Sequence, residues 1–598
     1  MIRTHRATEV TPEMVGQEVT LAGWVQRRRD HGGITFFDLR DASGLIQIVA
    51  DPAEHPIAED LKMEYCVRVT GVVRPRPEGT KNPNLQTGTI EVGATSIEVL
   101  SPARVLPFMI DDRAEVDELV RLRYRYLDLR RPRMAANLKA RSRATSAIRR
   151  TLDAMGFLEV ETPTLVNSTP EGARDMLVPS RLRKGEFYAL PQSPQLFKQL
   201  LMVAGVERYY QIARCYRDED FRADRQLEFT QLDLEGSFWE REDVLHAIEQ
   251  VLAAVVQELR GVELPLPLPR LTWHEAMDRY GSDKPDLRFG MEITDLSDLV
   301  AGSEFGVLAT TVANGGVVRG INAGRVEWSR ARADELTERA KQAGARGLVW
   351  MVVEEDGSLR SPVAKFFSDA ESAGIRERLG AGTGDVLLIV ADEWRTAVET
   401  LGMLRLELGR PSSHEELKFL WVVDFPMFEK DDDGAITFVH HPFTAPQSLE
   451  DMRERPLEAL AKAYDAVVNG IELGSGSIRN HDPAVQREIF EILGIDEEQA
   501  NRRFGWFLEA LEYGTPPHGG FAFGIDRLVM VLQDEASIRD VIPFPKTQTG
   551  MDPMTGAPTR VAKEQLEELG IQLGPEALAR LEEQTGESGD APLTSDDR

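Results

Sequence analysis

Cysteine and long apolar runs are scarce in this chain, and each shortage excludes a class of protein. Cys66 and Cys215 are the only cysteines among 598 residues, so a disulfide framework is not indicated and a reducing compartment fits. Residues 1–6 lack the apolar core of a signal peptide. No uninterrupted apolar stretch approaches the roughly 20 residues that a membrane-spanning helix needs. We therefore expect a cytoplasmic protein that makes no membrane contact.

Positive charge is also in short supply. The chain holds 70 basic and 99 acidic residues, a net charge of −29, which disfavours nucleic-acid binding by the molecule as a whole. The deficit is uneven, because residues 1–133 contain 19 basic and 20 acidic residues while the remainder contains 51 and 79. A polyanion is repelled least by the N-terminal part, so the distribution permits RNA contact there.

The N-terminal residues 1–105 read as a small β-barrel. Five short apolar segments are separated by glycines and one helix, which is typical of an OB-fold. Such barrels stack single-stranded bases on aromatic side chains beside a basic surface. Phe36 taken alone is more often a buried barrel aromatic than a base-stacking one. The five segments are 19–25, 34–39, 45–49, 65–73 and 89–92.

An arginine-rich hairpin is the most informative local pattern. Residues 209–213 and 227–234 alternate as strands do, and four arginines lie between them. Arginines in a hairpin loop suit a polyphosphate ligand. The alternative is a solvated hairpin tip held by ion pairs. The four are Arg214, Arg217, Arg222 and Arg225.

A second pattern lies far away in residues 516–532, a glycine-rich strand that runs into an apolar helix. Glycines let a ligand approach the backbone closely. Arg527 lies near the predicted helix start, where backbone amides also favour anions. Alone this is an ordinary strand-turn-helix, but together with the arginine hairpin it indicates a nucleotide site.

These segments resemble motifs 2 and 3 of the class II aminoacyl-tRNA synthetases. The amphipathic segment 140–155 and the following residues 156–163, which end in Pro163, resemble motif 1. Order, spacing and the N-terminal domain are similar to subclass IIb, and most of all to the bacterial aspartyl-tRNA synthetases. The resemblance implies a multi-domain α+β fold: an OB-fold barrel, a catalytic domain built on an antiparallel sheet, an inserted α+β domain, and a homodimer formed through motif 1.

The domain limits follow from the same comparison of patterns. The block 287–412 contains a helical segment, 329–343, and buried-strand segments at 347–353 and 385–391, but no catalytic constellation. Such an insertion is typical of the bacterial aspartyl enzymes and counts against the asparaginyl and lysyl relatives. The predicted order is an OB-fold at 1–105, a linker at 106–133, catalytic parts at 134–286 and 413–560, the insertion at 287–412, and a C-terminal extension at 561–598 with one helix and a disordered tail from 586.

The family's chemistry needs no side-chain nucleophile, because the amino-acid carboxylate itself attacks the α-phosphate of ATP. The protein must align two anions and stabilise charge, which calls for arginines and Mg²⁺. The resemblance assigns Arg217 to the α-phosphate and substrate carboxylate, Arg527 to the γ-phosphate, and Glu472 to Mg²⁺. Asp465 is the second expected Mg²⁺ ligand, or else a helix-surface acid. Further ATP contacts are expected from Asp218, Glu219, Gln226, Gly524, Ile525 and Asp526.

Amino-acid selection is assigned to the segment 192–199 and to scattered charged residues. By resemblance, Lys198 and Arg479 supply positive charge to a substrate carboxylate, so asparagine would leave them without a countercharge. His440 is expected near that carboxylate; alternatively it is a loop histidine, and a zinc site is rejected because no further ligands cluster there. The remaining aspartate-site residues are Ser193, Gln195 and Asp233, which orient these groups or take the α-amino group, and Glu171 in a closing loop.

The tRNA partners are tRNA-Asp and also tRNA-Asn if the resemblance to non-discriminating enzymes holds. His31 stands where tRNA-Asp-specific enzymes often carry an apolar residue, and Gly79 is its expected companion; alternatively His31 has no such role and charging is strict. Three other interpretations are weaker. The aspartate-site residues and the insertion count against a lysyl or asparaginyl enzyme, and a paralogue without activity should have lost Arg217, Glu472 or Arg527, which are all present. An OB-fold module with an unrelated partner domain would leave the arginine and glycine motifs unexplained. The family's anticodon-reading positions match Arg29, Phe36, Gln47 and Glu91.

Overall fold

The computed structural model describes residues 2–168, 173–219, 224–411, 413–431 and 433–585. The chain divides into two compact units, Met1–Arg133 and Met134–Arg598. No helix in the described part of the chain is long and apolar enough to cross a membrane.

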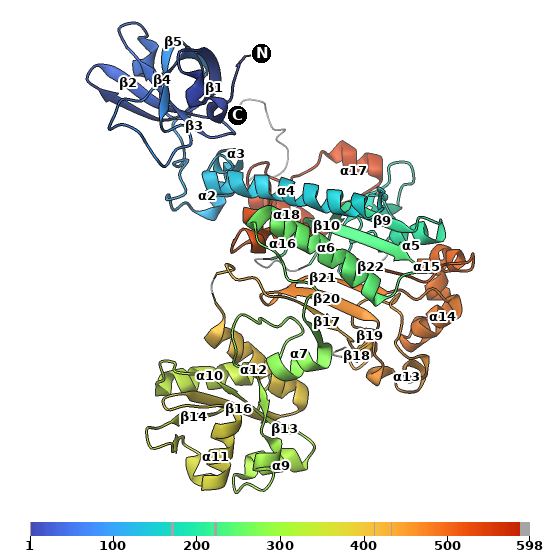
Figure 1. Cartoon of the computed structure of the whole chain (residues 1–598). Coiled ribbons are helices and arrows are strands. Elements are labelled where there is room, and N and C mark those ends of the chain that lie inside the picture. The colour runs from blue at the N-terminus through green and yellow to red at the C-terminus, as the bar shows by residue number, and fades with distance from the viewer. Residues whose placement is uncertain (1, 169–172, 220–223, 412, 432, 586–598) are drawn as a thin grey trace. The chain divides into compact units, whose positions relative to one another are not determined.

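The first unit contains a closed five-stranded barrel, which confirms the predicted OB-fold. Its strand order is β1-β2-β3-β5-β4 (Figure 1). Alternate residues such as Val25, Phe37 and Leu39 fill the barrel core. The strands are β1 (Glu18–His31), β2 (Ile34–Arg40), β3 (Leu45–Ala50), β4 (Cys66–Pro75) and β5 (Ile90–Ser101), with the helix α1 (Ile57–Asp60) before β4.

Two strands are longer than their sequence pattern predicts. The pairing of β1 with β2 shifts register between Val25 and Arg27, and a shift of this kind breaks the apolar alternation while the strand continues. The predicted segment ends at residue 25, but the strand continues through Arg27 to Arg29. The strand β5 likewise runs on to Ser101 after its buried residues end.

The acidic and basic segment at 106–133 is structured around one buried carboxylate. It contains α2 (Glu118–Arg123) and α3 (Arg125–Asp128). The Asp128 side chain is fully buried and accepts hydrogen bonds from Arg121, Arg125 and Arg131. Burying an acid requires such partners, so the Asp- and Arg-rich composition belongs to a folded element here.

The second unit is built on an eight-stranded sheet, β11-β17-β20-β21-β22-β10-β9-β6. Neighbouring strands from β17 to β9 pair antiparallel, which confirms the predicted sheet type. The two edge strands pair parallel. The strands are β6 (Leu158–Glu159), β9 (Arg208–Tyr216), β10 (Glu228–Ser237), β11 (Arg270–Thr272), β17 (Phe419–Val423), β20 (Ala463–Val468), β21 (Ile471–Ile478) and β22 (His518–Gly524).

One face of this sheet is covered by α4 (Pro132–Ala154), α6 (Arg241–Arg260) and α16 (Ile525–Leu532), which share a single core with it (Figure 1). Side chains alternate across a strand. Leu232 and Leu234 of β10 therefore pack into this core, whereas Gln231, Asp233 and Glu235 point to the opposite face. The predicted strand-to-helix step at motif 3 is confirmed as β22 followed directly by α16.

A separate antiparallel sheet, β12-β13-β16-β14-β15, occupies the region of the expected insertion. Its strand β16 sends Val386, Leu388 and Val390 into one core and Leu387 and Ile389 into another. Burial on both faces explains the unbroken apolar run at this strand. The elements are β12 (Thr294–Asp295), β13 (Val317–Asn322), β14 (Val349–Val353), β15 (Leu359–Arg360), β16 (Val386–Asp392), α8 (Ser297–Val300), α9 (Gly306–Ala313), α10 (Arg330–Gln342), α11 (Asp369–Arg378) and α12 (Trp394–Gly409).

The remaining elements belong to neither of these two sheets. After residue 560 the structure has two helices rather than the single one expected, and the predicted disordered tail, 586–598, lies outside the described residues. These elements are α5 (Gln195–Val203), α7 (Trp273–Tyr280), α13 (Leu449–Glu454), α14 (Pro483–Ile492), α15 (Glu497–Leu511), α17 (Lys563–Leu569), α18 (Pro575–Thr585), and the hairpins β7 (Leu177–Pro179) with β8 (Phe187–Ala189) and β18 (Phe428–Lys430) with β19 (Ile436–Phe438).

Candidate active site

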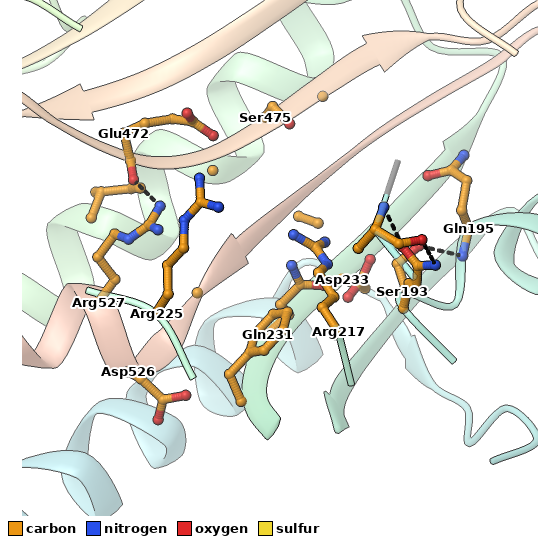
Figure 2. Close-up of a pocket in the computed structure, with 18 of the residues that line it drawn as sticks. Ser193, Gln195, Arg217, Arg225, Gln231, Asp233, Glu472, Ser475, Asp526 and Arg527 are labelled. Atoms are coloured by element: carbon orange, nitrogen blue, oxygen red, sulfur yellow. Dashed lines mark hydrogen bonds between the residues drawn. The ribbon is translucent and has the colours of Figure 1, made fainter. Parts of the chain in front are cut away.

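A cavity of about 460 Å³ lies on the sheet face opposite the three helices. Arg217, just after β9, and Arg527, in the first turn of α16, both line it, so the two arginine patterns converge as expected. Figure 2 shows Arg527, Arg225 and Glu472 toward one end, Ser193, Gln195 and Asp233 toward the other, and Arg217 between them.

The arginines are held by contacts that leave their charge facing the cavity. The Arg527 Nη1 atom donates to the backbone carbonyl of Glu472 at 2.6 Å, and its Nη2 atom lies 3.4 Å from Asp224. The Arg217 guanidinium stacks 5.0 Å from the ring centre of Phe229. A row of cations along an open cavity is suited to a polyphosphate.

A buried network of ions occupies the other end. The Lys198 Nζ atom lies 3.1 Å from Asp233 and 3.5 Å from Glu235, and Arg479 donates to both Glu235 oxygens at 2.8 and 3.1 Å. None of the four side chains is more than 2% exposed. The expectation that Lys198 and Arg479 depend on a substrate for their countercharge is therefore wrong, because Asp233 and Glu235 already balance them.

The two carboxylates respond differently to this burial. Burial raises the pKa of Asp233 above its ordinary value, against the attraction of Lys198. Burial also opposes ionisation of Glu235, but Arg479 and Lys198 outweigh it and lower the pKa of Glu235. The Asp233 Oδ2 atom is buried without a hydrogen-bond partner among the described residues. A buried orphan acceptor beside the cavity is suited to an ammonium group.

His440 and Asp465 form a second buried pair. The His440 Nε2 atom lies 3.1 Å from Asp465 Oδ1, and His440 lines the cavity. Burial raises the pKa of Asp465, and the attraction of Asp465 raises the pKa of His440 against the effect of burial. Asp465 is on strand β20, so its alternative assignment as a helix-surface acid is wrong.

Comparison with known proteins agrees with this arrangement. Residues 117–548 match the family model described as tRNA synthetases class II (D, K and N), and residues 19–100 match an OB-fold nucleic acid binding domain. The chain belongs to the class II tRNA synthetases.

Several relatives match this synthetase over almost its whole length. It is 58% identical to the aspartate--tRNA(Asp/Asn) ligase of Moorella thermoacetica over 95% of this chain and 96% of that one. It is 52% identical to the enzyme of the same name from Thermobifida fusca, over 96% and 99%. An asparaginyl-tRNA synthetase structure from Pyrococcus horikoshii, complexed with asparaginyl-adenylate, shares the fold with a TM-score of 0.58 and 20% identity, over 92% of this chain and 99% of that one.

Most residues that the sequence assigned to the site lie together. Gln226 is among them, but its amide group is occupied by the Lys546 backbone at 2.8 and 3.1 Å. The Asp526 carboxylate accepts from the Thr230 amide at 2.8 Å and from Arg141, so it fastens α16 to β10 and α4. The assigned residues that line the cavity are Ser193, Gln195, Lys198, Arg217, Glu219, Gln226, Asp233, His440, Glu472, Arg479, Gly524, Asp526 and Arg527.

Three assigned residues lie outside the cavity lining, and a fourth is not among the described residues. The Asp218 side chain is half exposed and faces Arg174 at 3.4 Å, outside the cavity lining. Ile525 is fully buried in the core beneath α16, and Asp465 lies behind His440 rather than in the lining. Glu171 lies outside the described residues.

The synthetase site also contains Arg225, which the sequence placed in the arginine hairpin without a separate role, and two residues that sequence reasoning missed, Glu235 and His441. Arg225 belongs to the arginine hairpin and pairs with Glu219 at 2.5 Å. Glu235 follows Asp233 at the two-residue period of β10, which was the available signal. Gly520 leaves the space for it, since a Cβ atom there would lie 1.9 Å from Glu235 Oε2.

The residues present fit a magnesium ion that takes its other ligands from substrate phosphates and water. Mg²⁺ commonly takes one or two carboxylates together with substrate phosphates and water. Glu472 faces the cavity, and Asp465 is close enough for the two charges to interact. No set of three or more histidine, cysteine or acidic residues in the described ranges could hold a metal without such added ligands.

The candidate RNA-reading residues form a connected set on the barrel. Arg29 pairs with Phe36 across β1 and β2, and Phe36 is half-buried whereas its neighbour Phe37 fills the core. Gln47 accepts from Arg29 at 3.5 Å and donates to Glu91 at 3.0 Å. His31, at the β1–β2 hairpin, and Gly79, in the β4–β5 loop, are both exposed.

Proposed function

We propose that this synthetase attaches L-aspartate to tRNA-Asp and tRNA-Asn through an aspartyl-adenylate, releasing pyrophosphate and AMP. The single observation that carries this is that Lys198, Arg479 and Asp233 line one cavity with Arg217, while the buried Glu235 pairs with both Lys198 and Arg479. The curated relatives named above are called aspartate--tRNA(Asp/Asn) ligases, which supports both tRNA partners.

Aspartate would bind by three charged groups. Its side-chain carboxylate faces Lys198 and Arg479, and its ammonium faces the orphan Oδ2 atom of Asp233. Its α-carboxylate then lies beside Arg217, next to the ATP phosphates that Arg225 and Arg527 hold. The positive charges of Lys198, Arg479 and Arg217 exceed the negative charges of Asp233 and Glu235 by one, so a substrate of net charge −1 neutralises this set. Asparagine, with no net charge, leaves the set with one uncompensated positive charge.

The first step needs positioning more than proton transfer. An α-carboxylate oxygen attacks the α-phosphorus, and the bond to the bridging oxygen of the β-phosphate breaks, so pyrophosphate leaves. Arg217 stabilises the charge on the α-phosphate, and Arg527 draws charge from the leaving end. Mg²⁺, held by Glu472 with Asp465 behind it, would neutralise phosphate charge when bound.

The second step transfers the amino acid to RNA. A terminal ribose hydroxyl of tRNA attacks the activated carbonyl carbon, AMP leaves with the bonding electrons, and the hydroxyl proton passes to the released phosphate. We assign anticodon recognition to Arg29, Phe36, Gln47 and Glu91, and tolerance of both anticodons to His31 and Gly79. All of these residues lie within 19–100, the range that matches the OB-fold nucleic acid binding domain. OB-folds bind single-stranded nucleic acid.

We also propose a homodimer formed through motif 1. The strand β6 is at the edge of the large sheet, and its Leu158 is 56% exposed. An exposed apolar residue on an unpaired edge is costly unless another chain covers it. Sedimentation equilibrium that returned only monomer at micromolar concentration would contradict this assignment.

The decisive experiment charges purified tRNA-Asp and tRNA-Asn transcripts separately with labelled aspartate. Both should accept aspartate, and labelled asparagine should be accepted by neither. Charging of tRNA-Asp alone would establish the stricter specificity, and failure of both with a folded enzyme would refute the proposal.

A further inference from the structure

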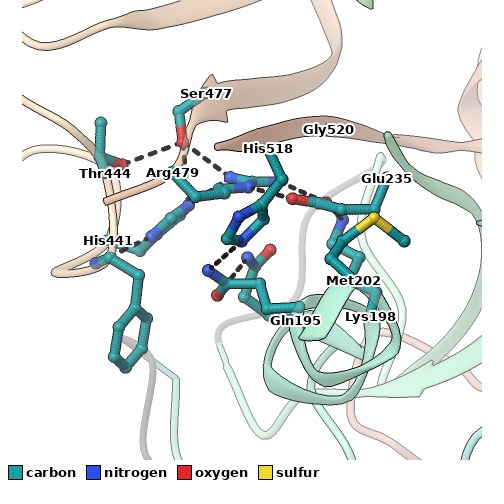
Figure 3. A network of polar contacts seen from close by, with 12 residues as sticks. Gln195, Lys198, Met202, Glu235, His441, Thr444, Ser477, Arg479, His518 and Gly520 are labelled. Atoms are coloured by element: carbon teal, nitrogen blue, oxygen red, sulfur yellow. Dashed lines mark hydrogen bonds and ion pairs between the residues drawn. The ribbon is translucent and has the colours of Figure 1, made fainter. Parts of the chain in front are cut away.

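Arg479 has almost no unused hydrogen-bonding capacity. Its Nε and Nη2 atoms donate to the two oxygens of Glu235, and its Nη1 atom donates to His441 Nε2 and to Ser477 Oγ, each at 2.7 Å (Figure 3). A guanidinium carries five N–H hydrogens. Four have acceptors among the described residues, and the fifth, on Nη2, remains for a ligand in the cavity that Arg479 lines.

Lys198 is also tied to the two carboxylates of β10. Its Nζ atom donates to Asp233 Oδ1 at 3.1 Å and forms an ion pair with Glu235 Oε2 at 3.5 Å. An ammonium group has three hydrogens, so Lys198 keeps donor capacity for a ligand in the cavity that it lines. Each of the two cations can therefore offer a donor to a ligand.

We propose that Glu235 is a positioning and specificity-determining residue, which fixes Arg479 and uses up its surplus donors so that the pocket matches a carboxylate. One donor from each cation can meet one oxygen of a carboxylate. A carboxamide has one oxygen, and its NH₂ group would meet a donor. Both oxygens of Glu235 accept from Arg479, and its Oε2 atom also pairs with Lys198, so Glu235 joins the two cations, whereas Asp233 pairs with Lys198.

The surroundings of Glu235 support a fixed geometry. The carboxylate is fully buried, and Gly520 lies so close that no larger residue fits there. His441 is the acceptor that Arg479 requires, because burial and the Arg479 charge keep its pKa well below the usual histidine value. His518 accepts from Gln199 at 3.1 Å and closes the far side of the network. Bidentate binding of Arg by a carboxylate fixes the plane of the guanidinium.

The test compares Glu235→Gln with Glu249→Gln. Glutamine at 235 keeps the shape but places an NH₂ group against Arg479 or Lys198, so the aspartate KM in pyrophosphate exchange should rise about 100-fold, with the ATP KM changed less than about threefold. The activity ratio of aspartate to asparagine should fall at the same time. Glu249 is an equally buried carboxylate that accepts from Trp421 and Leu268 away from the cavity, so its variant should retain both KM values.

Two outcomes would overturn the proposal. If Glu235 acted only as a negative charge, its removal would lower the aspartate KM; if it acted only in folding, the activities measured with ATP and with aspartate would fall together and the aspartate KM would not rise selectively. Should Glu235→Gln not fold, Ser477→Ala removes one neutral acceptor of Arg479 and should raise the aspartate KM about fivefold with the ATP KM unchanged. The proposal rests on aspartate being the substrate, which aspartate-dependent exchange by the unaltered enzyme tests separately.

Discussion

The Nζ atom of Lys198 lies 3.1 Å from Asp233 Oδ1 and 3.5 Å from Glu235 Oε2, so one buried ammonium joins two carboxylates that lie two residues apart on β10. Replacing it with Lys198→Met leaves the pair of acids with Arg479 alone. The loss of a buried charge partner should raise the aspartate KM about 100-fold while the ATP KM changes little. Pyrophosphate exchange measures both, and Lys341→Met, at an exposed lysine of α10, is the matched control. An unchanged aspartate KM would show that Lys198 does not face the substrate.

Substitution of Arg527 should change the KM for ATP rather than the KM for aspartate. Arg527 lies at the Glu472 end of the cavity, away from Ser193 and Asp233 (Figure 2). Arg527→Ala should raise the ATP KM about 30-fold, because one charge-assisted phosphate contact is lost, and leave the aspartate KM nearly constant. Arg330→Ala, at an exposed position on α10, is the control. A rise in the aspartate KM alone would reverse the orientation of the two substrates.

Phe36 and Phe37 are neighbours with different expected roles. Phe36 is half-buried beside Arg29, and Phe37 is fully buried in the barrel. Phe36→Leu should raise the KM for tRNA about tenfold through lost base stacking, with pyrophosphate exchange unaffected. Phe37→Leu should instead cost about 1 kcal/mol of stability, seen as an earlier unfolding of the barrel. Equal tRNA kinetics for the Phe36 variant and the unaltered enzyme would remove Phe36 from the RNA site.

Substitution of His31 tests whether this residue allows the enzyme to charge both tRNA-Asp and tRNA-Asn. An apolar side chain at this exposed hairpin position should restrict charging, so His31→Leu is expected to reduce tRNA-Asn charging relative to tRNA-Asp about tenfold, the size of one lost or gained base contact. His5→Leu, elsewhere in the same unit, controls for loss of a histidine. A constant ratio of the two kcat/KM values would leave His31 without a role in selection.

Local patterns in the sequence were sufficient for the barrel, the arginine hairpin and the glycine-rich strand before α16, because each depends on periodicity within a few residues. Local patterns were insufficient where the role of a residue depends on a partner that is distant in the sequence. Glu235 is 244 residues from Arg479, so neither segment reveals the ion pair that determines the chemistry of the pocket. Gln226 has the right place in the hairpin, yet the backbone of Lys546, far along the chain, takes its amide. The extension of β1 past Val25 was hidden by a change of register, which local alternation cannot report.

Asp286 makes the stability of the folded protein depend on pH. It lies just before the segment that forms the smaller sheet. Its carboxylate pairs with Arg288 at 2.6 Å, both side chains are buried, and its backbone carbonyl accepts from Arg405 at 2.8 Å. Burial opposes ionisation, but the Arg288 hydrogen bonds outweigh it and hold the pKa of Asp286 below its ordinary value. A depressed folded-state pKa gives stability that is present above the unfolded pKa and is lost as pH falls through the folded one.

Asp286→Asn should therefore lower the unfolding midpoint at pH 7, through a loss of about 3 kcal/mol, and the difference from the unaltered enzyme should shrink as the pH falls below about 4. Differential scanning calorimetry across pH 3 to 7.5 measures this. Asp298→Asn is the control, because Asp298 forms an exposed pair with Arg378 in which solvent screens the charges, and its midpoint should hardly move. A deficit for Asp286→Asn that stayed constant down to the acid limit would mean that lost packing, rather than the ionised carboxylate, causes the instability.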